Sequence, residues 1–353
     1  MFKRFIYEAN LQLFANHLNV TTDTRDTSTT PYNAESVGGA NTLSAEMKTY
    51  YDMRLIDEAS AQLVHDQFGQ KRPIPKGGGK TIEFRKFSPL PKATTPLEEG
   101  VTPNGKRLDV TAMTATVNQY GDFITHSDVL ELTALDNVIL ESTKLLGRQA
   151  GLTLDTITRN ILNASTNVTY APQISASGEE TIVESRADLN ETCALTVKLV
   201  QKVVAKLKGQ NAPKINGSYV AIIHPYNSYQ LMRDPEWKYP HQYKDTSNLY
   251  EGEIGMVAGV RFVESTEAKI WREGGHAIFS TLFLADGAYG VTEITGGGLT
   301  TIIKQKGSAG TADPLDQRSS VGWKAIKTAE VLVPSYMVRV ESCVADFDGT
   351  EAN

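Results

Sequence analysis

The string most typical of an enzyme is PKGGGKT, from Pro75 to Thr81. A phosphate-binding loop has the pattern G-x-x-x-x-G-K-[ST] between a buried strand and a helix, so that backbone N–H groups and the helix dipole face the phosphate. In this chain Ile74 occupies the first glycine position, and the strand-like run TIEFRKF follows the lysine. We therefore interpret the three glycines as a hinge in a basic segment and not as a nucleotide site.

The histidines and cysteines also lack the spacing that chemistry requires. None of the six histidines lies three or four positions from another, and His224 and His241 only flank a polar stretch. A zinc helix would need two histidines on one face. Cys193 and Cys343 have no second pair with which to form a zinc site, which favours two free, buried thiols in a reducing compartment. We expect no catalytic residues, no metal and no cofactor.

Aromatic and basic residues alternate between Tyr226 and Tyr243, around Trp237 and Lys238. Such a pattern can stack single-stranded bases when it lines a basic groove. Acidic residues are mixed into this stretch, however, and no basic cluster is present. A loop packed on its own domain, or a contact between subunits, is therefore the favoured interpretation.

Composition narrows the class of protein further. The chain has 353 residues, 40% of them hydrophobic and 22% charged, which is ordinary for a globular protein. Its pI of about 5.6 disfavours a nucleic-acid footprint over the whole surface. The beginning, MFKRFIYEANLQLF, interleaves charged and apolar residues, unlike a signal peptide, and no run approaches a membrane span. We expect a soluble protein made in a cytoplasm.

The most unusual stretch runs from Lys71 to Asp128. Two strand-like runs, Thr81–Phe87 and Leu108–Thr125, flank a tip rich in turn residues, namely Pro96, Gly100, Pro103, Asn104 and Gly105. The pattern predicts a long hairpin with a broad tip and little apolar surface for a core of its own. A two-stranded hairpin alone in water is marginally stable, so this one needs a partner.

Charge indicates what kind of partner that is. The segment from Lys71 through Arg107 has nine Lys and Arg against three Asp and Glu, a net charge of +6, whereas the whole chain carries −6. The rest of the chain therefore carries −12. We predict an acidic surface as the partner, either another copy or a nucleic acid. For contact between copies, the candidate residues are Lys92, Glu98, Glu99, Lys106 and Arg107, because exposed charges in a turn pair readily with a neighbouring chain.

Three helices are predicted outside this hairpin. The first follows a polar arm, with Ser44 as its cap, an apolar stripe at every fourth residue from Met47 to Leu63, and Gly69 at its end. The second is the longest, from about Asp136 to Ala164, with Asp136 as its cap. The third spans about Asp188 to Lys208.

Strands are predicted mainly in the second half of the chain. Their expected ranges are Tyr219–Ile223, one strand within GEIGMVAGVRFVEST, Ala277–Ala285, Gly290–Thr295, Leu299–Gln305, Gly322–Thr328 and Ala329–Glu341. Strands that alternate with helices in this way indicate a compact mixed domain.

Several motifs in fixed order resemble the major capsid proteins of tailed bacteriophages, and are similar to the N-four-like branch with the Hong Kong-phage shell fold. They are GKTIEFRKFSPLPKATTPLEEGVTP, VNQYGDFITHSD, QAGLTLD, YVAIIHP, EGEIGMVAGVRFVES and GSAGTADPLDQRSSVGWK, and the likeness extends from about residue 44 to 341. None of these motifs has a catalytic rationale.

The resemblance implies an α+β capsid fold with four parts and a tail. These are an N-terminal arm with one amphipathic helix (1–70), an extended hairpin loop (71–127), a peripheral domain with a long spine helix (128–168 and 319–345), an axial mixed α/β domain (169–318) and a C-terminal tail (346–353). In such a shell, the extended loop of one subunit lies across its neighbour.

The resemblance also implies the function. The chain would be a major capsid protein, with no enzyme activity, that self-assembles through hexamers and pentamers into the icosahedral shell around double-stranded phage DNA. Its expected partners are other copies, scaffold, portal and decoration proteins, and non-specifically packaged DNA, without a membrane. Its expected location is the virion capsid, after synthesis in the host cytoplasm. Two alternatives stay open: the shell of an encapsulin-like bacterial nanocompartment, and a soluble enzyme.

Overall fold

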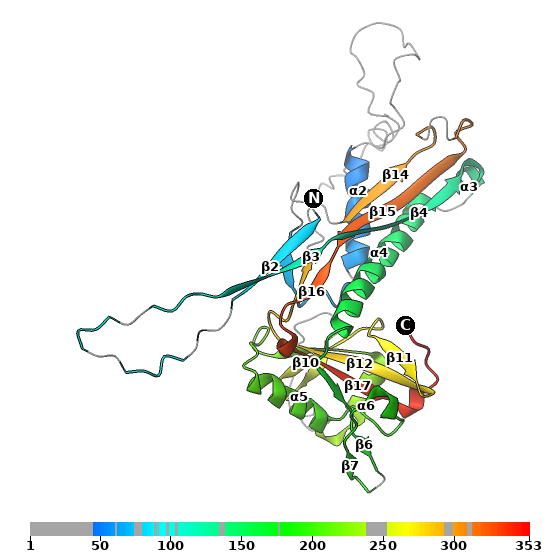
Figure 1. The fold of residues 1–353 in the computed structure, drawn as a ribbon. Coiled ribbons are helices and arrows are strands. Elements are labelled where there is room, and N and C mark those ends of the chain that lie inside the picture. The colour runs from blue at the N-terminus through cyan, green and yellow to red at the C-terminus, as the bar shows by residue number, and fades with distance from the viewer. Residues whose placement is uncertain are drawn as a thin grey trace, which may run out of the picture. The chain divides into compact units, whose positions relative to one another are not determined.

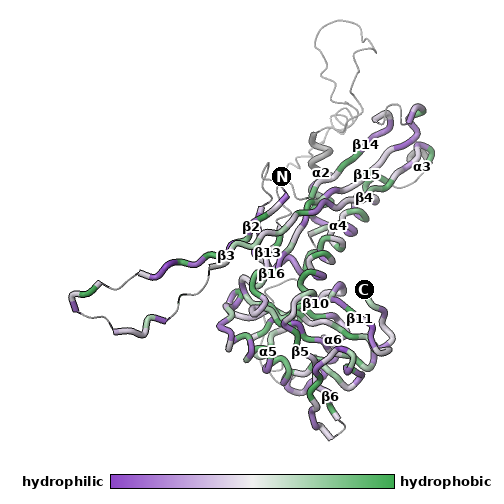
Figure 2. The backbone as a smooth tube through the Cα atoms, in the orientation of Figure 1, coloured by the Kyte–Doolittle hydropathy of each residue, from purple (hydrophilic) through white to green (hydrophobic). Residues whose placement is uncertain are grey.

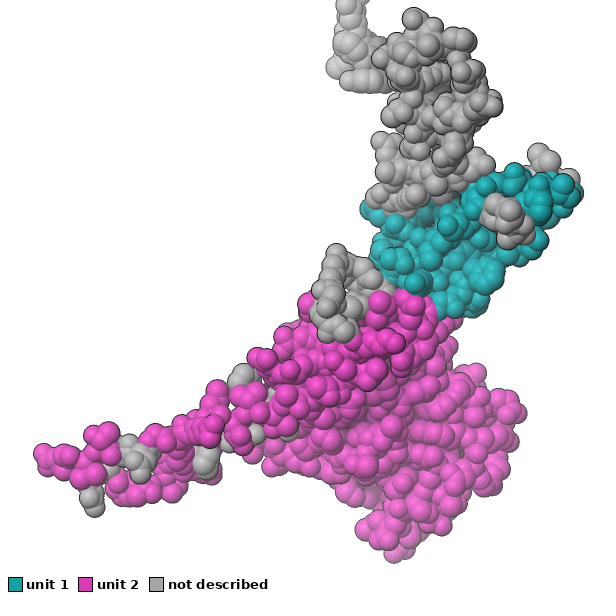
Figure 3. All heavy atoms as spheres, turned by 45° about the horizontal axis from the view of Figure 1, so that its top comes forward, with its two compact units in different colours: residues 1–60, 121–150, 299–324 teal, residues 61–120, 151–298, 325–353 magenta. Residues whose placement is uncertain are grey.

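The computed structural model describes residues 45–60, 62–73, 80–87, 90, 92–96, 99–102, 105–133, 138–175, 177–237, 253–292, 299–308 and 313–353. The predicted helix caps Ser44 and Asp136 lie outside these residues. The chain divides into two compact units, drawn in two colours in Figure 3. Unit 1 comprises residues up to 60, 121–150 and 299–324, and unit 2 comprises residues 61–120, 151–298 and 325–353.

Helices and strands alternate along the described chain (Figure 1). The α-helices are α2 (Ala45–Ser60), α3 (Asp128–Thr133), α4 (Val138–Asn163), α5 (Val197–Gly209) and α6 (Pro225–Arg233). The strands are β1 (Gln70–Arg72), β2 (Thr81–Phe87), β3 (Val110–Thr116), β4 (Asn118–Ser127), β5 (Val168–Tyr170), β6 (Gln173–Ile174), β7 (Glu180–Thr181), β8 (Tyr219–Ile223), β9 (Glu253–Val257), β10 (Val260–Glu264), β11 (Ile270–Glu273), β12 (His276–Leu284), β13 (Tyr289–Thr292), β14 (Leu299–Lys304), β15 (Arg318–Lys327), β16 (Ala329–Val331) and β17 (Met337–Cys343).

Unit 1 is built on a three-stranded sheet in the order β14-β15-β4. Along β15, Val321 and Trp323 are buried and Lys324 is exposed, so one face of the sheet is covered. Trp323 donates its indole N–H to the Gln149 side chain of α4 at 3.2 Å, and the backbone of Thr301 in β14 donates to Asp52 of α2 at 3.2 Å. The two helices therefore cover the same sheet.

A close approach of α2 and α4 explains why the long helix contains Gly147. A Cβ atom at Gly147 would lie 3.0 Å from the Leu55 carbonyl oxygen, so a larger residue would separate the helices. Leu55 and Leu146 are buried. The predicted long helix is confirmed as α4, 26 residues long, and this contact offsets the cost of about 1 kcal/mol that glycine has within a helix.

The first predicted helix is confirmed as α2, but the prediction of its end was wrong. The helix ends at Ser60, well before Gly69. The backbone N–H of His65 donates to the Asp155 carboxylate at 2.7 Å, and so serves a tertiary contact in place of a helical one. Gly69 has a different role, because a Cβ atom there would lie 2.6 Å from the buried ring of Tyr289.

Unit 2 contains a seven-stranded sheet in the order β5-β17-β12-β8-β10-β9, with β11 paired to β12. Strand β8 has five apolar residues that are all buried. One side of β8 contributes to a hydrophobic core shared with α5, through Tyr219, Ala221 and Ile223. The other side contributes Val220 and Ile222 to a second core, which includes Leu162 of α4 and Tyr289 of β13. Both faces of the sheet are therefore covered, which explains the uninterrupted apolar run.

Two predicted elements of unit 2 needed correction, and several short strands were not predicted. The single strand expected in GEIGMVAGVRFVEST is a hairpin, β9–β10, because Ala258 and Gly259 both adopt positive φ (53° and 83°) and form a tight turn. Strands β5, β6, β7 and β11 were not predicted. The run 329–341 is two strands, β16 and β17, interrupted by a 3-10 turn that begins at Pro334.

The third predicted helix also begins later than expected. Residues 186–188 form one 3-10 turn, and α5 starts only at Val197. The Thr196 hydroxyl caps α5 by accepting the N–H of Leu199 at 3.3 Å. The apolar stripe predicted for this helix is buried as expected, including Leu199, Val203 and Leu207.

Strand β17 lies between β5 and β12 in the seven-stranded sheet. Residues 337–343 are thus central to the mixed α/β sheet, whereas the expected division assigns them to the part with the spine helix. The pairing of β17 with β12 over seven residue pairs, from Ile278–Cys343 to Leu284–Met337, fixes this position. The division into named shell parts remains a prediction.

A buried polar network joins three segments within unit 2. His65 and Asp155 are 2.6 Å apart between Nδ1 and Oδ2, and neither side chain is exposed. The neighbouring residue Asp66 accepts the Thr158 hydroxyl at 2.6 Å and forms an ion pair with Lys327, whose side chain is fully buried. A buried charge is tolerated only when it is paired and hydrogen-bonded, so this network fixes the register of the three segments.

We predict that the burial of His224 makes the folded state less stable in acid. Burial lowers the pKa of His224 from its ordinary value of 6.5 to about 4, while its Nδ1 accepts the N–H of Tyr226 at 3.2 Å and caps α6. The unfolded state therefore binds this proton more tightly than the folded state, and the stability present above pH 6.5 is lost as the pH falls toward 4.

The variant His224→Asn keeps a capping acceptor and removes the titration. We expect the wild type to lose roughly 2 kcal/mol more than this variant between neutral pH and pH 4, measured by urea unfolding at each pH. Parallel pH profiles for the two proteins would contradict this assignment.

Candidate assembly surface

The predicted hairpin exists, and its base is anchored in unit 2. Strands β2 and β3 pair in antiparallel register from Thr81–Thr116 to Phe87–Val110. Phe84 is fully buried and clusters with Ile82, Ala115, Leu332 and Val333. The expectation of a hairpin without a core was therefore wrong for its base, because the chain supplies that core itself. The second run was also shorter than expected, because β4 continues into the sheet of unit 1.

Gly290 makes room for this anchor. A Cβ atom at Gly290 would lie 2.3 Å from Cε1 of Phe84. The substitution Gly290→Ala should therefore displace Phe84 and destabilise the chain by about 1–3 kcal/mol, as overpacking of a core does. Urea unfolding would measure this loss. Gly209→Ala is the control, because a Cβ atom at that position meets nothing within 4 Å and the substitution should be nearly neutral. Gly259→Ala would not serve, because the positive φ of Gly259 strains any residue with a side chain.

The segment between β2 and β3 is here called the extended loop, and its described residues form no core with their own chain. Every residue described between Leu90 and Val110 is exposed. The apolar side chains of Leu90, Val101 and Leu108 are 57%, 59% and 58% exposed. Figure 1 shows the two sides of this loop leaving the ends of the paired strands, and Figure 2 shows hydrophilic residues along it. Exposed apolar residues beside charges are typical of a binding surface.

The residues predicted for contact between copies lie in this loop. Lys92, Glu99, Lys106 and Arg107 are all exposed, and Glu98 lies outside the described residues. Among the described residues, the one group of potential metal ligands contains none of these four. Their placement fits a surface that binds another molecule, and which atoms they bind stays a prediction.

A second exposed surface was not predicted from the sequence. It is the uncovered face of the sheet in unit 1, here called the outer sheet face, where Phe123 of β4 is 66% exposed and Ile302 of β14 is 41% exposed. Phe123 lies beside Gly322, where a Cβ atom would approach it to 2.8 Å. The run GDFITHS gave no signal for it, because its two large apolar residues, Phe123 and Ile124, are adjacent and therefore point to opposite faces of the strand.

The other candidate motifs have structural roles in the described residues. A strand, β2, begins at Thr81 where a phosphate-binding loop would open a helix, and residues 74–79 lie outside the described chain. Tyr226 stacks on Phe347 at 3.9 Å between ring centroids, and Trp237 is buried against Phe262. The rest of the aromatic stretch, from residue 238, is also outside the described residues. Cys193 and Cys343 are free and buried, as predicted.

Among the described helices, none combines the length and the apolar character needed to cross a bilayer.

Comparison with known proteins identifies the class of the fold. The model of the phage capsid protein family matches residues 136–296, which is less than half of the chain. This segment contains all of α4, the sheet strands β8 to β12, and α5 and α6. Among curated proteins there is no match.

Solved capsid structures match most of the chain. The capsid of Ralstonia phage GP4 matches with a TM-score of 0.62 at 11% identity, covering 93% of this chain and 99% of that one. The capsid of cyanophage Pam1 matches with a TM-score of 0.60 at 12% identity, covering 92% and 100%. The capsid of cyanophage P-SCSP1u matches with a TM-score of 0.59 at 14% identity, covering 80% and 88%. The fold is therefore that of phage capsid proteins.

The family match and the capsid fold agree, and together they support a phage major capsid protein. Both findings favour a role as a shell subunit located in the virion capsid. This is a structural role, consistent with the expectation that the protein is not an enzyme.

Proposed function

We propose that this shell is icosahedral, is built from hexamers and pentamers, and encloses double-stranded phage DNA. In this proposal the extended loop of each copy lies on an acidic surface of a neighbouring copy. The observation that carries the proposal is the exposure of the loop, since Leu90, Val101 and Leu108 are all more than half exposed in the single chain. Burial against a neighbour would remove these side chains from water and stabilise the contact.

Charge supports the same contact. The segment from Lys71 through Arg107 carries +6 and the remaining chain −12, so a loop on a neighbouring body brings opposite charges together. Such complementarity speeds the encounter of two copies and disfavours wrong registers more than it adds affinity. Packaged DNA would be a second acidic partner, and the anchored base of the hairpin leaves the loop available to either.

The outer sheet face is the second surface that we assign to contact between copies. Phe123 and Ile302 expose apolar area on a sheet whose other face is filled by helices. Exposed apolar groups on one sheet face are typical of a surface that another protein covers. The loop and this face together would give each copy two contact surfaces, as a closed shell requires.

We also propose a narrower family, a division of the subunit, further partners and a place of synthesis. They are the N-four-like branch with the Hong Kong-phage shell fold, the four-part division of the subunit, scaffold, portal and decoration proteins as partners, and synthesis in the host cytoplasm. The order of the motifs between residues 44 and 341 supports the branch. The long helix α4 and the mixed sheet of unit 2 support a spine helix and an axial domain.

Electron microscopy of the purified full-length protein tests the proposal. Closed shells, or rings of five and six copies, are expected. Particles from infected cells should contain double-stranded DNA. A co-purified enzyme inside DNA-free particles would favour the nanocompartment, and a particle-free monomer that turns over a substrate would favour an enzyme.

A further inference from the structure

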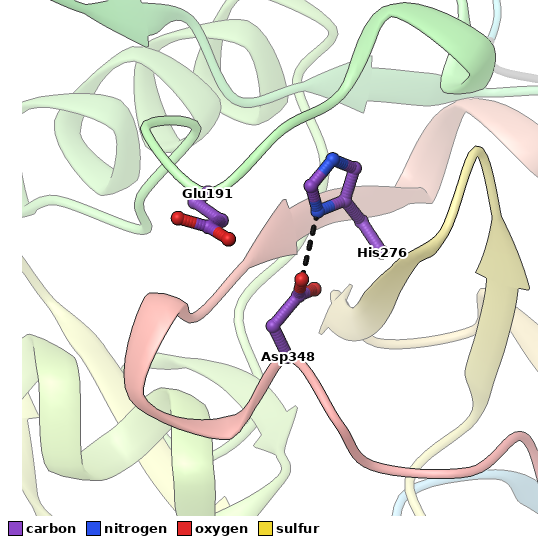
Figure 4. A group of neighbouring side chains, drawn as sticks. All are labelled: Glu191, His276 and Asp348. Carbon is purple, nitrogen blue, oxygen red and sulfur yellow. Dashed lines mark hydrogen bonds and ion pairs between the residues drawn. The ribbon is translucent and has the colours of Figure 1, made fainter.

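Three potential metal ligands meet near the C-terminus of unit 2. Glu191 comes from the loop before α5, His276 is the first residue of β12, and Asp348 follows the last 3-10 turn (Figure 4). One ligand atom of each residue lies within 4.8 Å of the others. Glu191 is exposed, whereas His276 and Asp348 are half-buried, so the group is open to solvent on one side only.

We propose that these residues form a binding site for a divalent transition-metal ion, with Zn²⁺ as the expected occupant. The chemistry of the donors supports this class, since an imidazole nitrogen with two carboxylates suits zinc and its neighbours. Calcium and magnesium prefer oxygen ligands throughout, and the imidazole therefore disfavours them. Three protein ligands leave a coordination position open for water.

A backbone N–H orients the Asp348 donor, as the second shell of a metal site does. Asp348 uses Oδ1 to accept the backbone N–H of Ala277 at 2.9 Å, and its Oδ2 lies 2.9 Å from His276 Nδ1. The carboxylate is therefore held on both sides, with Oδ2 directed toward the imidazole (Figure 4). Such outer hydrogen bonds fix the orientation of metal ligands.

Within the described residues, the two carboxylates of this group outnumber its one imidazole, and the charge of Arg272 also acts on Asp348. Glu191 forms no ion pair there, and its carboxylate faces the His276–Asp348 pair (Figure 4). Arg272 lies nearby, but its guanidinium donates to the backbone carbonyls of Asp348, Thr350 and Gly275. Two carboxylates within reach of one imidazole thus favour a bound cation.

A bound ion would join three segments that are distant in sequence. The C-terminal segment already returns to β11, where Asn353 accepts the backbone N–H of Ile270 at 2.9 Å and donates to the Ala268 carbonyl at 3.0 Å. A metal at Asp348 would connect this segment to β12 and to the loop before α5. Because the ion binds the folded arrangement, it should stabilise unit 2 against unfolding.

The test uses the full-length protein, stripped with a chelator and then titrated with Zn²⁺, and with Co²⁺ as a spectroscopic probe. We expect one ion per chain, a cobalt absorption spectrum with an imidazole ligand, and a Tm raised by a few degrees at saturating zinc. Glu191→Gln keeps the exposed side chain's size and leaves the His276–Asp348 pair intact. It should weaken zinc binding by about 10-fold or more.

Glu184→Gln is the matched control, because Glu184 is another exposed glutamate in the same loop region. It should bind zinc as the wild type does. Equal zinc affinity in Glu191→Gln and wild type, or no binding by the wild type at excess zinc, would overturn the proposal. The result is independent of shell formation, since the three ligands belong to one chain.

Discussion

Reversing three charges of the extended loop, by Lys92→Glu, Lys106→Glu and Arg107→Glu together, is expected to abolish shell formation while each chain stays folded. The three reversals change the net charge of Lys71 through Arg107 from +6 to zero. They also place acidic groups on an acidic neighbour, and like charges in contact cost several kcal/mol. All three side chains are exposed, so the fold of the single chain should not depend on them. Sedimentation velocity would show particles for the wild type and slowly sedimenting species for the variant.

The control makes the same change of charge outside the loop. Lys202→Glu, Lys208→Glu and Lys214→Glu alter three exposed lysines of α5 and the turn after it. This variant should still form shells, because it makes the body more acidic and leaves the loop basic. Normal assembly by the loop variant would show that charge does not set the contact.

Removing the fully buried ammonium group of Lys327 in unit 2 is expected to cause the largest loss of stability. Lys327→Met replaces a fully buried ammonium that pairs with Asp66, and leaves that carboxylate buried without its counter-charge. Breaking a buried ion pair in this way typically costs about 3–5 kcal/mol. Urea unfolding should show this loss, whereas Lys324→Met, on the same strand but exposed, should change stability by less than about 0.5 kcal/mol.

A double variant separates charge from packing. If the uncompensated carboxylate causes the loss, Asp66→Asn combined with Lys327→Met should recover part of the stability, since the remaining amide can still accept the Thr158 hydroxyl. Equal stability of the single and double variants would attribute the loss to packing around residue 327.

The local elements could be predicted where periodicity and burial agree. Strand β8 was predicted at its observed bounds, because a short apolar run between turn residues allows few other structures. The long helix α4 was predicted to within two residues, because its apolar stripe is sustained. The end of α2 was not predicted from local pattern, because the apolar spacing continues to Leu63. The chain beyond the helix instead makes a tertiary contact, from the His65 N–H to Asp155, 90 positions away. The β9–β10 turn was missed because a positive φ at Ala258 is unusual for a residue with a side chain.

The candidate surfaces too could be predicted from local pattern only where no contact between distant residues was involved. Turn residues and charge were enough to locate the extended loop and its exposed basic residues. The packing of Phe84 against Gly290 could not be predicted from the sequence. A local pattern does not indicate which distant glycine leaves space for an aromatic ring. The group of Glu191, His276 and Asp348 was missed for a similar reason, since its members are far apart in sequence. They meet through the pairing of β12 with β17 and through the hydrogen bond from the Cys343 N–H to the Cys193 carbonyl at 2.8 Å.

The most direct test of the central claim is a cryo-electron microscopy map of the assembled particle, traced through the extended loop. The account predicts a closed shell in which the loop of each copy lies on a neighbouring copy, with Lys92, Lys106 and Arg107 facing acidic side chains and Leu90, Val101 and Leu108 covered. A shell in which the loop folds onto its own chain, or points into solvent, would contradict it.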